Sequence, residues 1–373
     1  MKQTLLVKLA PTEMQFQMLK ETMEAFNEAC NSIAETAFQT RTFNNWQLHH
    51  LVYHEIRERF KLSAQLTVRA ISKVADAYKV SKETRVAFDL HGAVVYDQRI
   101  LSWKGLEAVS ILTLKGRQRV PMLIGTYQEA RMDRIRGQAD LILRDGIFYL
   151  AATIETPETE PFTAKDFLGV DLGVRNIATD SDGERWMGKE LNGIRNRYAK
   201  IRKRLQSKGT KSSRRLLRKR SRKEHRFASA VNHAISKRIV QKAKDTLRGI
   251  ALENLKGIRL RVTVKGSSQR RTIHSWSFNQ LQQFIGYKAK LAGVPIVYVE
   301  PRNTSRTCPS CGFVAKANRK GESFRCQACG FAGHADSIAA ENIRRVAVNR
   351  PDASKDFFRH VSLSPLGASH LTC

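Results

Sequence analysis

Two pairs of cysteines near the C-terminus restrict the possible folds more than any other feature of the sequence. The pairs are Cys308 with Cys311 and Cys326 with Cys329, and a glycine follows each pair. Each Cys-x-x-Cys pair can present two thiolates to one ion, and the segment between them is long enough for a β-hairpin that closes a tetrahedral Zn–S₄ site. A thioredoxin-like redox role is the alternative. A closed site of four thiolates predicts a structural zinc, which holds a small ribbon together.

Net charge is the second constraint, and it concerns the partner. The 373-residue chain has a formal net charge of +31, too large for an ordinary soluble enzyme, which indicates a polyanionic partner such as nucleic acid. We expect no membrane partner, because no apolar run approaches the ~20 residues of a spanning helix, and the N-terminus lacks a signal-peptide core. Cys30 and Cys373 stand alone, as in a reducing compartment. These features predict a cytoplasmic protein, associated with the nucleoid when it is bound to DNA.

Basic residues are densest between Arg195 and Arg226, where Glu224 is the only acid. Apolar residues such as Ile201 and Leu205 give parts of this run a helical face. Such a run is usually a solvated surface, but here it predicts helices that hold a nucleic-acid backbone with strong affinity and no sequence preference. The helical pattern continues to Leu247, and we expect Gly249 to end it.

The N-terminal half shows a change of period from helical to extended. Residues 3–9 alternate as in a strand, and Thr12 with Gln15 forms a capping box that opens a long amphipathic helix. Stripes around Leu48, Leu51 and Leu66 predict two more helices. The β-prone runs that follow are residues 86–88, 94–102, 109–114, 120–124, 141–143 and 148–154, the last two flanking an Asp145-Gly146 turn. Because the first strand precedes the helices and its partners follow them, the helices look like an insertion into a small antiparallel barrel.

Three short apolar segments in the C-terminal half carry an acid at one end. Asp171 ends an apolar run and begins a hairpin with the next strand, Glu253 ends another strand, and Asp336 opens a helix. By itself Asp171 is equally well explained as a turn-capping residue. If the three acids converge, they cannot all ionise without a counter-charge, and a pair of Mg²⁺ ions is the natural occupant. Two such ions can activate water and stabilise the leaving oxygen in phosphodiester hydrolysis.

These residues carry a resemblance to a known family. Residues 169–173, 250–255 and 336–343 look like the three RuvC motifs of the TnpB family, and the match extends through residues 294–299 and 303–312. The family consists of transposon-encoded RNA-guided DNA endonucleases related to type V CRISPR effectors. The resemblance implies a Mg²⁺-dependent endonuclease that hydrolyses DNA phosphodiesters by a two-metal mechanism, with Asp171, Glu253 and Asp336 as catalytic magnesium ligands. It also implies a guide RNA derived from the element and a double-stranded DNA target.

The resemblance also implies an α+β multidomain architecture. The expected parts are a wedge-type barrel (1–10 and 82–160), an inserted helical recognition domain (11–81), an RNase H-like RuvC domain (161–305 and 333–349), an inserted zinc ribbon (306–332) and a disordered tail (350–373). One departure is Ile338, where the family commonly has asparagine. That position is not a metal ligand, so we expect it to affect activity little.

Three other functions compete with a guided nuclease. A nuclease-inactive RNA-guided DNA-binding regulator would have lost an acid, whereas all three are present. An unguided nuclease or transposase accessory protein is compatible with the charge, because RNA guidance is not readable from composition. A sugar-kinase or actin-like ATPase could share the sheet and a Gly-x-Asp-x-Gly loop, but the charge and the cysteine pairs argue against it.

Overall fold

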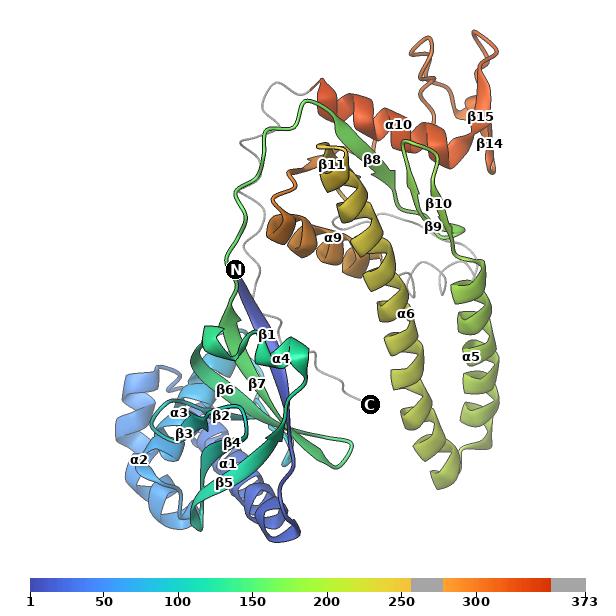
Figure 1. Ribbon diagram of the computed structural model, residues 1–373. Coiled ribbons are helices and arrows are strands. Elements are labelled where there is room, and N and C mark those ends of the chain that lie inside the picture. Colours follow the sequence, from blue (N-terminus) through green and yellow to red (C-terminus); the bar gives the residue numbers. More distant parts are fainter. Residues whose placement is uncertain (256–277, 350–373) are drawn as a thin grey trace. The chain divides into compact units, whose positions relative to one another are not determined.

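The computed structural model describes residues 1–255 and 278–349 and divides into two compact units, Met1–Pro157 and Glu158–Cys373 (Figure 1). The α+β class is confirmed. The loop predicted around residues 259–271 and the predicted disordered tail lie outside the described residues. Across the two described ranges, no helix has the length and apolar character needed to cross a membrane.

A seven-stranded sheet of antiparallel pairs forms the framework of the first unit. In sheet order its strands are β2 (Val94–Tyr96), β6 (Ile135–Arg144), β7 (Ile147–Glu155), β1 (Lys2–Leu9), β5 (Gly116–Leu123), β4 (Ala108–Thr113) and β3 (Leu101–Lys104). The two ends of the sheet approach one another, because the Tyr96 hydroxyl of β2 donates a hydrogen bond of 3.1 Å to the Leu112 carbonyl of β4. The sheet is therefore nearly closed, as in a barrel. The predicted Asp145-Gly146 turn is present between β6 and β7, with both residues at positive φ.

Three helices lie in the chain between β1 and its sheet partners. They are α1 (Glu13–Gln39), α2 (Asn45–Phe60) and α3 (Ala64–Tyr78). The capping box of Thr12 and Gln15 at the start of α1 is present as predicted. Buried residues of helices and sheet, among them Phe26, Ile71 and Leu150, belong to one continuous hydrophobic core. The helices thus pack directly on the sheet.

In the first unit, side-chain contacts account for two differences between the predicted and the observed strands. The predicted strand at 86–88 is wrong, because Asn31 of α1 donates to the Phe88 carbonyl and accepts from its N–H, taking the place of a strand partner. The predicted run 94–102 is broken into β2 and β3 by a turn in which the Asp97 carboxylate accepts from the Arg99 N–H. Leu51 is exposed on α2 and does not join the core.

The second unit contains a five-stranded mixed sheet. In order, its strands are β10 (Arg185–Met187), β9 (Asn176–Asp180), β8 (Phe167–Asp171), β11 (Gly249–Glu253) and β12 (Ile296–Val299). The predicted hairpin is confirmed, since β8 and β9 are antiparallel, while β11 runs parallel to both β8 and β12. The acids Asp171 and Glu253 end two neighbouring parallel strands.

Helices cover both faces of this sheet. Alternate residues of β8 and β11, such as Leu168 and Ile250, pack with α6 (Lys211–Asp245) and α9 (Phe278–Ala292). The intervening residues, Phe167 and Ala251, pack with α10 (Ala335–Val348) on the opposite face. The period of two along each strand therefore decides which helix a side chain meets.

The basic run forms a helical hairpin of α5 (Lys189–Lys208) and α6, which lie side by side in Figure 1. Most of its cations are exposed, as predicted, but Arg195 is half-buried and Arg202 pairs with Glu224 at 2.9 Å. The other end of α6 is anchored to the sheet, because Lys242 lies 2.5 Å from the fully buried carboxylate of Asp180. A partner helix and this ion pair hold the two ends of α6.

A small three-stranded antiparallel sheet lies between β12 and α10 in the chain. Its strands are β13 (Arg319–Lys320), β14 (Ser323–Arg325) and β15 (Ala332–His334), preceded by a 3₁₀ turn at Lys316–Asn318. Phe324 is fully buried and packs with Cys308 and Cys326 and with Ile338 of α10. The departure at Ile338 therefore fills an apolar contact between this ribbon and the helix that carries Asp336.

Candidate active site

Strand register places two of the predicted acids beside one another. Leu252 of β11 pairs with Val170 of β8, so Glu253 and Asp171 follow at adjacent carboxyl ends of parallel strands. Both come one residue after a side chain that packs toward α6 and α9, and they therefore point to the opposite face, where α10 lies.

The third acid arrives because α10 crosses β8 at close range. A Cβ atom at Gly169 would lie 2.0 Å from the Ala340 carbonyl oxygen of α10, so only glycine permits this approach. Asp336 lies in the first turn of α10, where its N–H donates to Nδ1 of His334 at 3.3 Å. His334 is thus the N-cap of α10.

All three acids line one pocket of about 560 Å³, together with Thr304 and Arg319. Asp336 is buried, while Asp171 and Glu253 retain partial exposure to the pocket. The pocket brings together residues that are far apart in the chain: 82 residues separate Asp171 from Glu253, and 83 separate Glu253 from Asp336.

Three polar side chains that the sequence did not identify contact these carboxylates. Asn176 and Arg319 each donate to Asp336 at 3.0 Å, one to each carboxylate oxygen. Thr304 donates to Oε1 of Glu253 at 2.5 Å. Asn176 lies just after the first motif and Thr304 lies within the matched segment 303–312, whereas nothing in the sequence distinguishes Arg319 from the many other arginines.

Burial and mutual repulsion dominate the electrostatics of the pocket. Burial, followed by the nearby charges of Glu253 and Asp336, raises the pKa of Asp171 to about 8. Burial also raises the pKa of Glu253, although the Thr304 hydroxyl and the Arg319 guanidinium oppose that shift. Arg319, which comes from the ribbon, is therefore a cationic partner of a cluster whose members cannot all ionise easily.

The four paired cysteines meet as predicted. Their sulfur atoms all lie within 4.8 Å of one another, and two of the separations, Cys308 to Cys329 and Cys311 to Cys326, are 3.6 Å. Four sulfurs at about 2.3 Å from one zinc would be about 3.8 Å apart at the corners of a tetrahedron, so the geometry fits that ion. The N–H groups of Cys329 and Ala328 point at the Cys326 sulfur and lower the pKa of its thiol to about 6, which favours the thiolate that binds metal.

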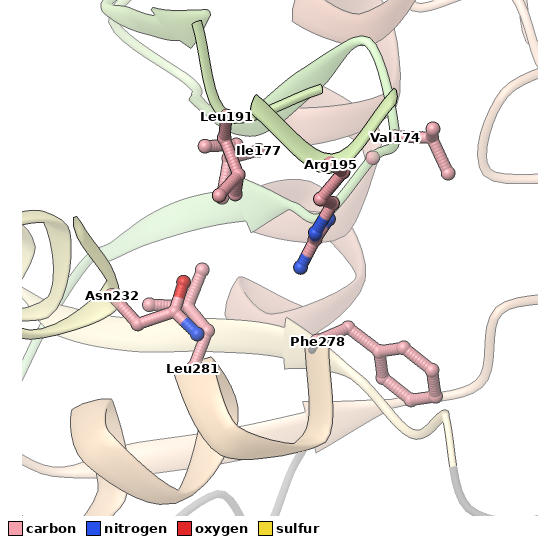
Figure 2. Close-up of a pocket in the computed structure, with 8 residues that line it drawn as sticks. Val174, Ile177, Leu191, Arg195, Asn232, Phe278 and Leu281 are labelled. Carbon is pink, nitrogen blue, oxygen red and sulfur yellow. The ribbon is translucent and has the colours of Figure 1, made fainter. Parts of the chain in front are cut away.

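A second hollow lies beside the Gly173-Val174 segment that follows β8. Figure 2 shows Arg195 extending into it from α5, with Asn232 of α6 and Phe278 of α9 at its other sides. Its volume is about 10 Å³, enough for no more than a water molecule. None of the three acids lines it, so we regard it as a packing gap next to the site.

Two known family profiles match segments of this chain. The profile described as "Probable transposase" matches residues 150–258, and the profile "Cas12f1-like, TNB domain" matches residues 278–343. The CRISPR-associated endodeoxyribonuclease Cas12f1 of Sulfoacidibacillus thermotolerans is 37% identical over 119 residues, which span 31% of this chain but only 26% of that protein. The chain thus covers about a quarter of that relative's length.

Two further similarities cover more of the molecule. A solved structure described as the Cas12f1-sgRNA-target DNA complex has the same fold over 88% of this chain and 83% of its own, with a TM-score of 0.62 and 16% identity. The TnpB-like protein MJ0751 of Methanocaldococcus jannaschii is 31% identical over 195 residues, which span 49% of this chain and 69% of that protein. The chain therefore belongs to the TnpB family.

Proposed function

We propose that the protein is an RNA-guided, Mg²⁺-dependent DNA endonuclease encoded by a transposable element. The observation that carries the proposal is the pocket in which Asp171, Glu253 and Asp336 meet beside Arg319. Relatives named as an endodeoxyribonuclease and as TnpB-like support it, as does the shared fold with a Cas12f1 that was solved with its RNA and target DNA.

The three carboxylates fit a divalent metal site. All their ligand atoms are oxygens, and the raised pKa of Asp171 reflects burial and repulsion among these acids, which the charge of Arg319 offsets only in part. Asp171, Glu253 and Asp336 would hold the ions, and bound Mg²⁺ would supply Lewis-acid chemistry for phosphodiester hydrolysis. Across residues 1–255 and 278–349, the four paired cysteines are the cluster whose ligand atoms already lie close enough together to hold a metal ion. The three carboxylates would have to move closer to one another to bind Mg²⁺.

The neighbouring polar residues would orient the acids and the substrate. Asn176 holds one oxygen of Asp336, which leaves the other oxygen to Arg319. A guanidinium has five donors, so Arg319 can bind a phosphate oxygen as well as Asp336. In this proposal Arg319 positions the scissile phosphate over the acids.

The cysteine ribbon would hold one structural zinc through Cys308, Cys311, Cys326 and Cys329. Since β13 of this ribbon carries Arg319, the zinc would also fix the position of that cation relative to Asp336. The ribbon at 306–332, the RuvC parts at 161–305 and 333–349, and the wedge and recognition parts of the first unit keep their expected boundaries in this proposal.

The exposed cations of α5 and α6 would bind the nucleic-acid backbone. Arg204, Lys208, Lys211 and Arg215 are examples of the exposed cations on this hairpin. Phosphate contacts release counterions, so affinity should fall steeply with salt and carry no sequence information. Target choice would then rest on base pairing with the guide RNA.

Replacing the 3′ segment of the copurified RNA tests the proposal directly. The RNA should be one structured transcript from the end of the element, and a new 3′ segment should redirect Mg²⁺-dependent cleavage to the matching DNA. An Asp336→Ala protein with the same RNA is the matched control, which should bind target DNA without cutting it. Cleavage at unchanged sites after the exchange would support an unguided nuclease, and guided binding without cleavage by the native chain would support a regulator.

A further inference from the structure

The carboxylate of Glu253 is held by a threonine that carries no catalytic signature of its own. The Thr304 hydroxyl lies 2.5 Å from Oε1 of Glu253 and 3.4 Å from the Pro301 carbonyl oxygen. A hydroxyl has one proton to donate, and the shorter bond to the acid receives it. Thr304 is only 6% exposed, so water cannot readily replace its hydroxyl as the donor to Glu253.

Thr304 is held in place by the helix that also carries Asp336. The buried side-chain amide of Asn342, on α10, donates to the Thr304 carbonyl at 2.7 Å and to the Thr307 carbonyl at 2.8 Å. One helix therefore supports two of the three acids: it carries Asp336 itself, and it supports Glu253 through Thr304.

The main chain at Glu253 has an independent support. Gln282 of α9 donates to the Glu253 carbonyl at 2.7 Å. Removing the Thr304 hydroxyl should therefore release the carboxylate without displacing strand β11. Because the main chain and the carboxylate of Glu253 have different hydrogen-bond partners, a variant that lacks the Thr304 hydroxyl tests the support of the carboxylate alone.

We propose that Thr304 is a positioning residue of the active site, which acts by fixing the Glu253 carboxylate through its hydroxyl. The inference rests on the proposed role of the three acids in holding metal. Removing a hydrogen-bond partner of a metal-ligating carboxylate typically lowers metal affinity or activity by roughly 10- to 100-fold. A carboxylate that can rotate must be reordered each time the site binds an ion.

Valine and serine substitutions separate the hydroxyl from the shape of the side chain. Thr304→Val keeps the branched shape and should weaken Mn²⁺ binding to the full-length, RNA-free chain by roughly 10-fold or more, measured from the electron paramagnetic resonance of free Mn²⁺. In the RNA-loaded protein it should lower kcat similarly, with KM for DNA unchanged. Thr304→Ser should restore most of both quantities.

Two further variants give the test its reference points. Asp336→Ala shows which part of the Mn²⁺ binding belongs to the acids. Thr246→Val is the matched control, because it removes a hydroxyl that donates to the Lys242 carbonyl at the end of α6. It should change neither metal binding nor cleavage.

Three outcomes of these measurements would overturn the proposed role of Thr304. Wild-type Mn²⁺ affinity and kcat in Thr304→Val would overturn the inference while leaving the proposed function intact. Equal losses in Thr304→Val and Thr304→Ser, accompanied by a lower melting temperature, would show a merely structural role and overturn it too. If Asp336→Ala binds as much Mn²⁺ as the wild type, the proposed metal site fails, and the role of Thr304 fails with it.

Discussion

Replacing Asp171 by asparagine should stabilise the metal-free protein at high pH and abolish cleavage. Asparagine keeps the size of the side chain but removes a charge that burial, Glu253 and Asp336 all disfavour. It also removes an oxygen donor that the proposed metal site requires. Stability and activity should therefore change in opposite directions.

The size of the stability effect follows from the shifted pKa of Asp171. Its pKa rises from 3.8 to about 8 in the folded protein, and each unit corresponds to about 1.4 kcal/mol, which gives a ceiling of about 6 kcal/mol. Because the pocket is open and Arg319 lies close by, solvent and counter-charge should reduce this to about 1–3 kcal/mol.

The sign of the pH dependence is set by the direction of the shift. A carboxyl whose pKa is raised by folding costs nothing below pH 4, where it is protonated in both states. Between about pH 4 and pH 8 the unfolded chain ionises this carboxyl while the folded wild type keeps it protonated, so rising pH favours the unfolded chain until Asp171 also ionises in the folded protein. The stability of Asp171→Asn relative to wild type should therefore grow between pH 4 and 8 and then level off.

Urea unfolding of both proteins between pH 5 and pH 9 measures this difference. The buffers should lack divalent cations and also strong chelators, which would remove a metal from the cysteine site. Added Mg²⁺ at pH 8 should raise the stability of the wild type and leave Asp171→Asn unchanged, because only a site with all its ligands binds it well. A stability difference that is the same at pH 5 and pH 9 would refute the raised pKa of Asp171 and the repulsion among the acids that follows from it.

Three further predictions concern other parts of the second unit. Arg319→Gln should lower kcat by roughly 100-fold or more while RNA binding persists, and an unchanged cleavage rate would remove Arg319 from the site. Cys326→Ser should lose the one zinc per chain expected by elemental analysis and lower solubility, because structural zinc binding is coupled to folding; a zinc-free protein that is equally folded and active would contradict this. Lys242→Met should destabilise the second unit by about 3–5 kcal/mol, since Asp180 would be buried without its cation. Lys288→Met is the comparison and should cost less, because this half-buried lysine donates to the His233 carbonyl and the Ser236 hydroxyl and, within the described residues, pairs with no acid.

Much of the local structure could be predicted from neighbouring residues alone. The capping box at Thr12, the hairpin turn at Asp145 and the cysteine pairs depend on groups only a few residues apart, so their signals lie within one short segment. The three acids were also recognisable, because each follows or opens an apolar segment of clear period. Their joint catalytic role stays a prediction until cleavage is measured.

Glycine positions show where this local reasoning fails. Gly249 was predicted to end α6, but Leu247 takes the left-handed conformation there, with φ 51°. Gly249 instead lies in β11, where a Cβ atom would come within 2.4 Å of the Phe167 ring of the neighbouring strand. The reason for that glycine is a tertiary contact, which no helix-end rule contains.

The sequence by itself determined most of the helices and strands, which four cysteines form one cluster, and which acids are candidates for one site. Only the tertiary structure decided that Asn176, Thr304 and Arg319 would contact those acids, since these contacts join segments 160, 51 and 17 residues apart. The physical reason is that periodicity and capping act between near neighbours in the chain, whereas these hydrogen bonds depend on strand order and on the close approach of α10 at Gly169.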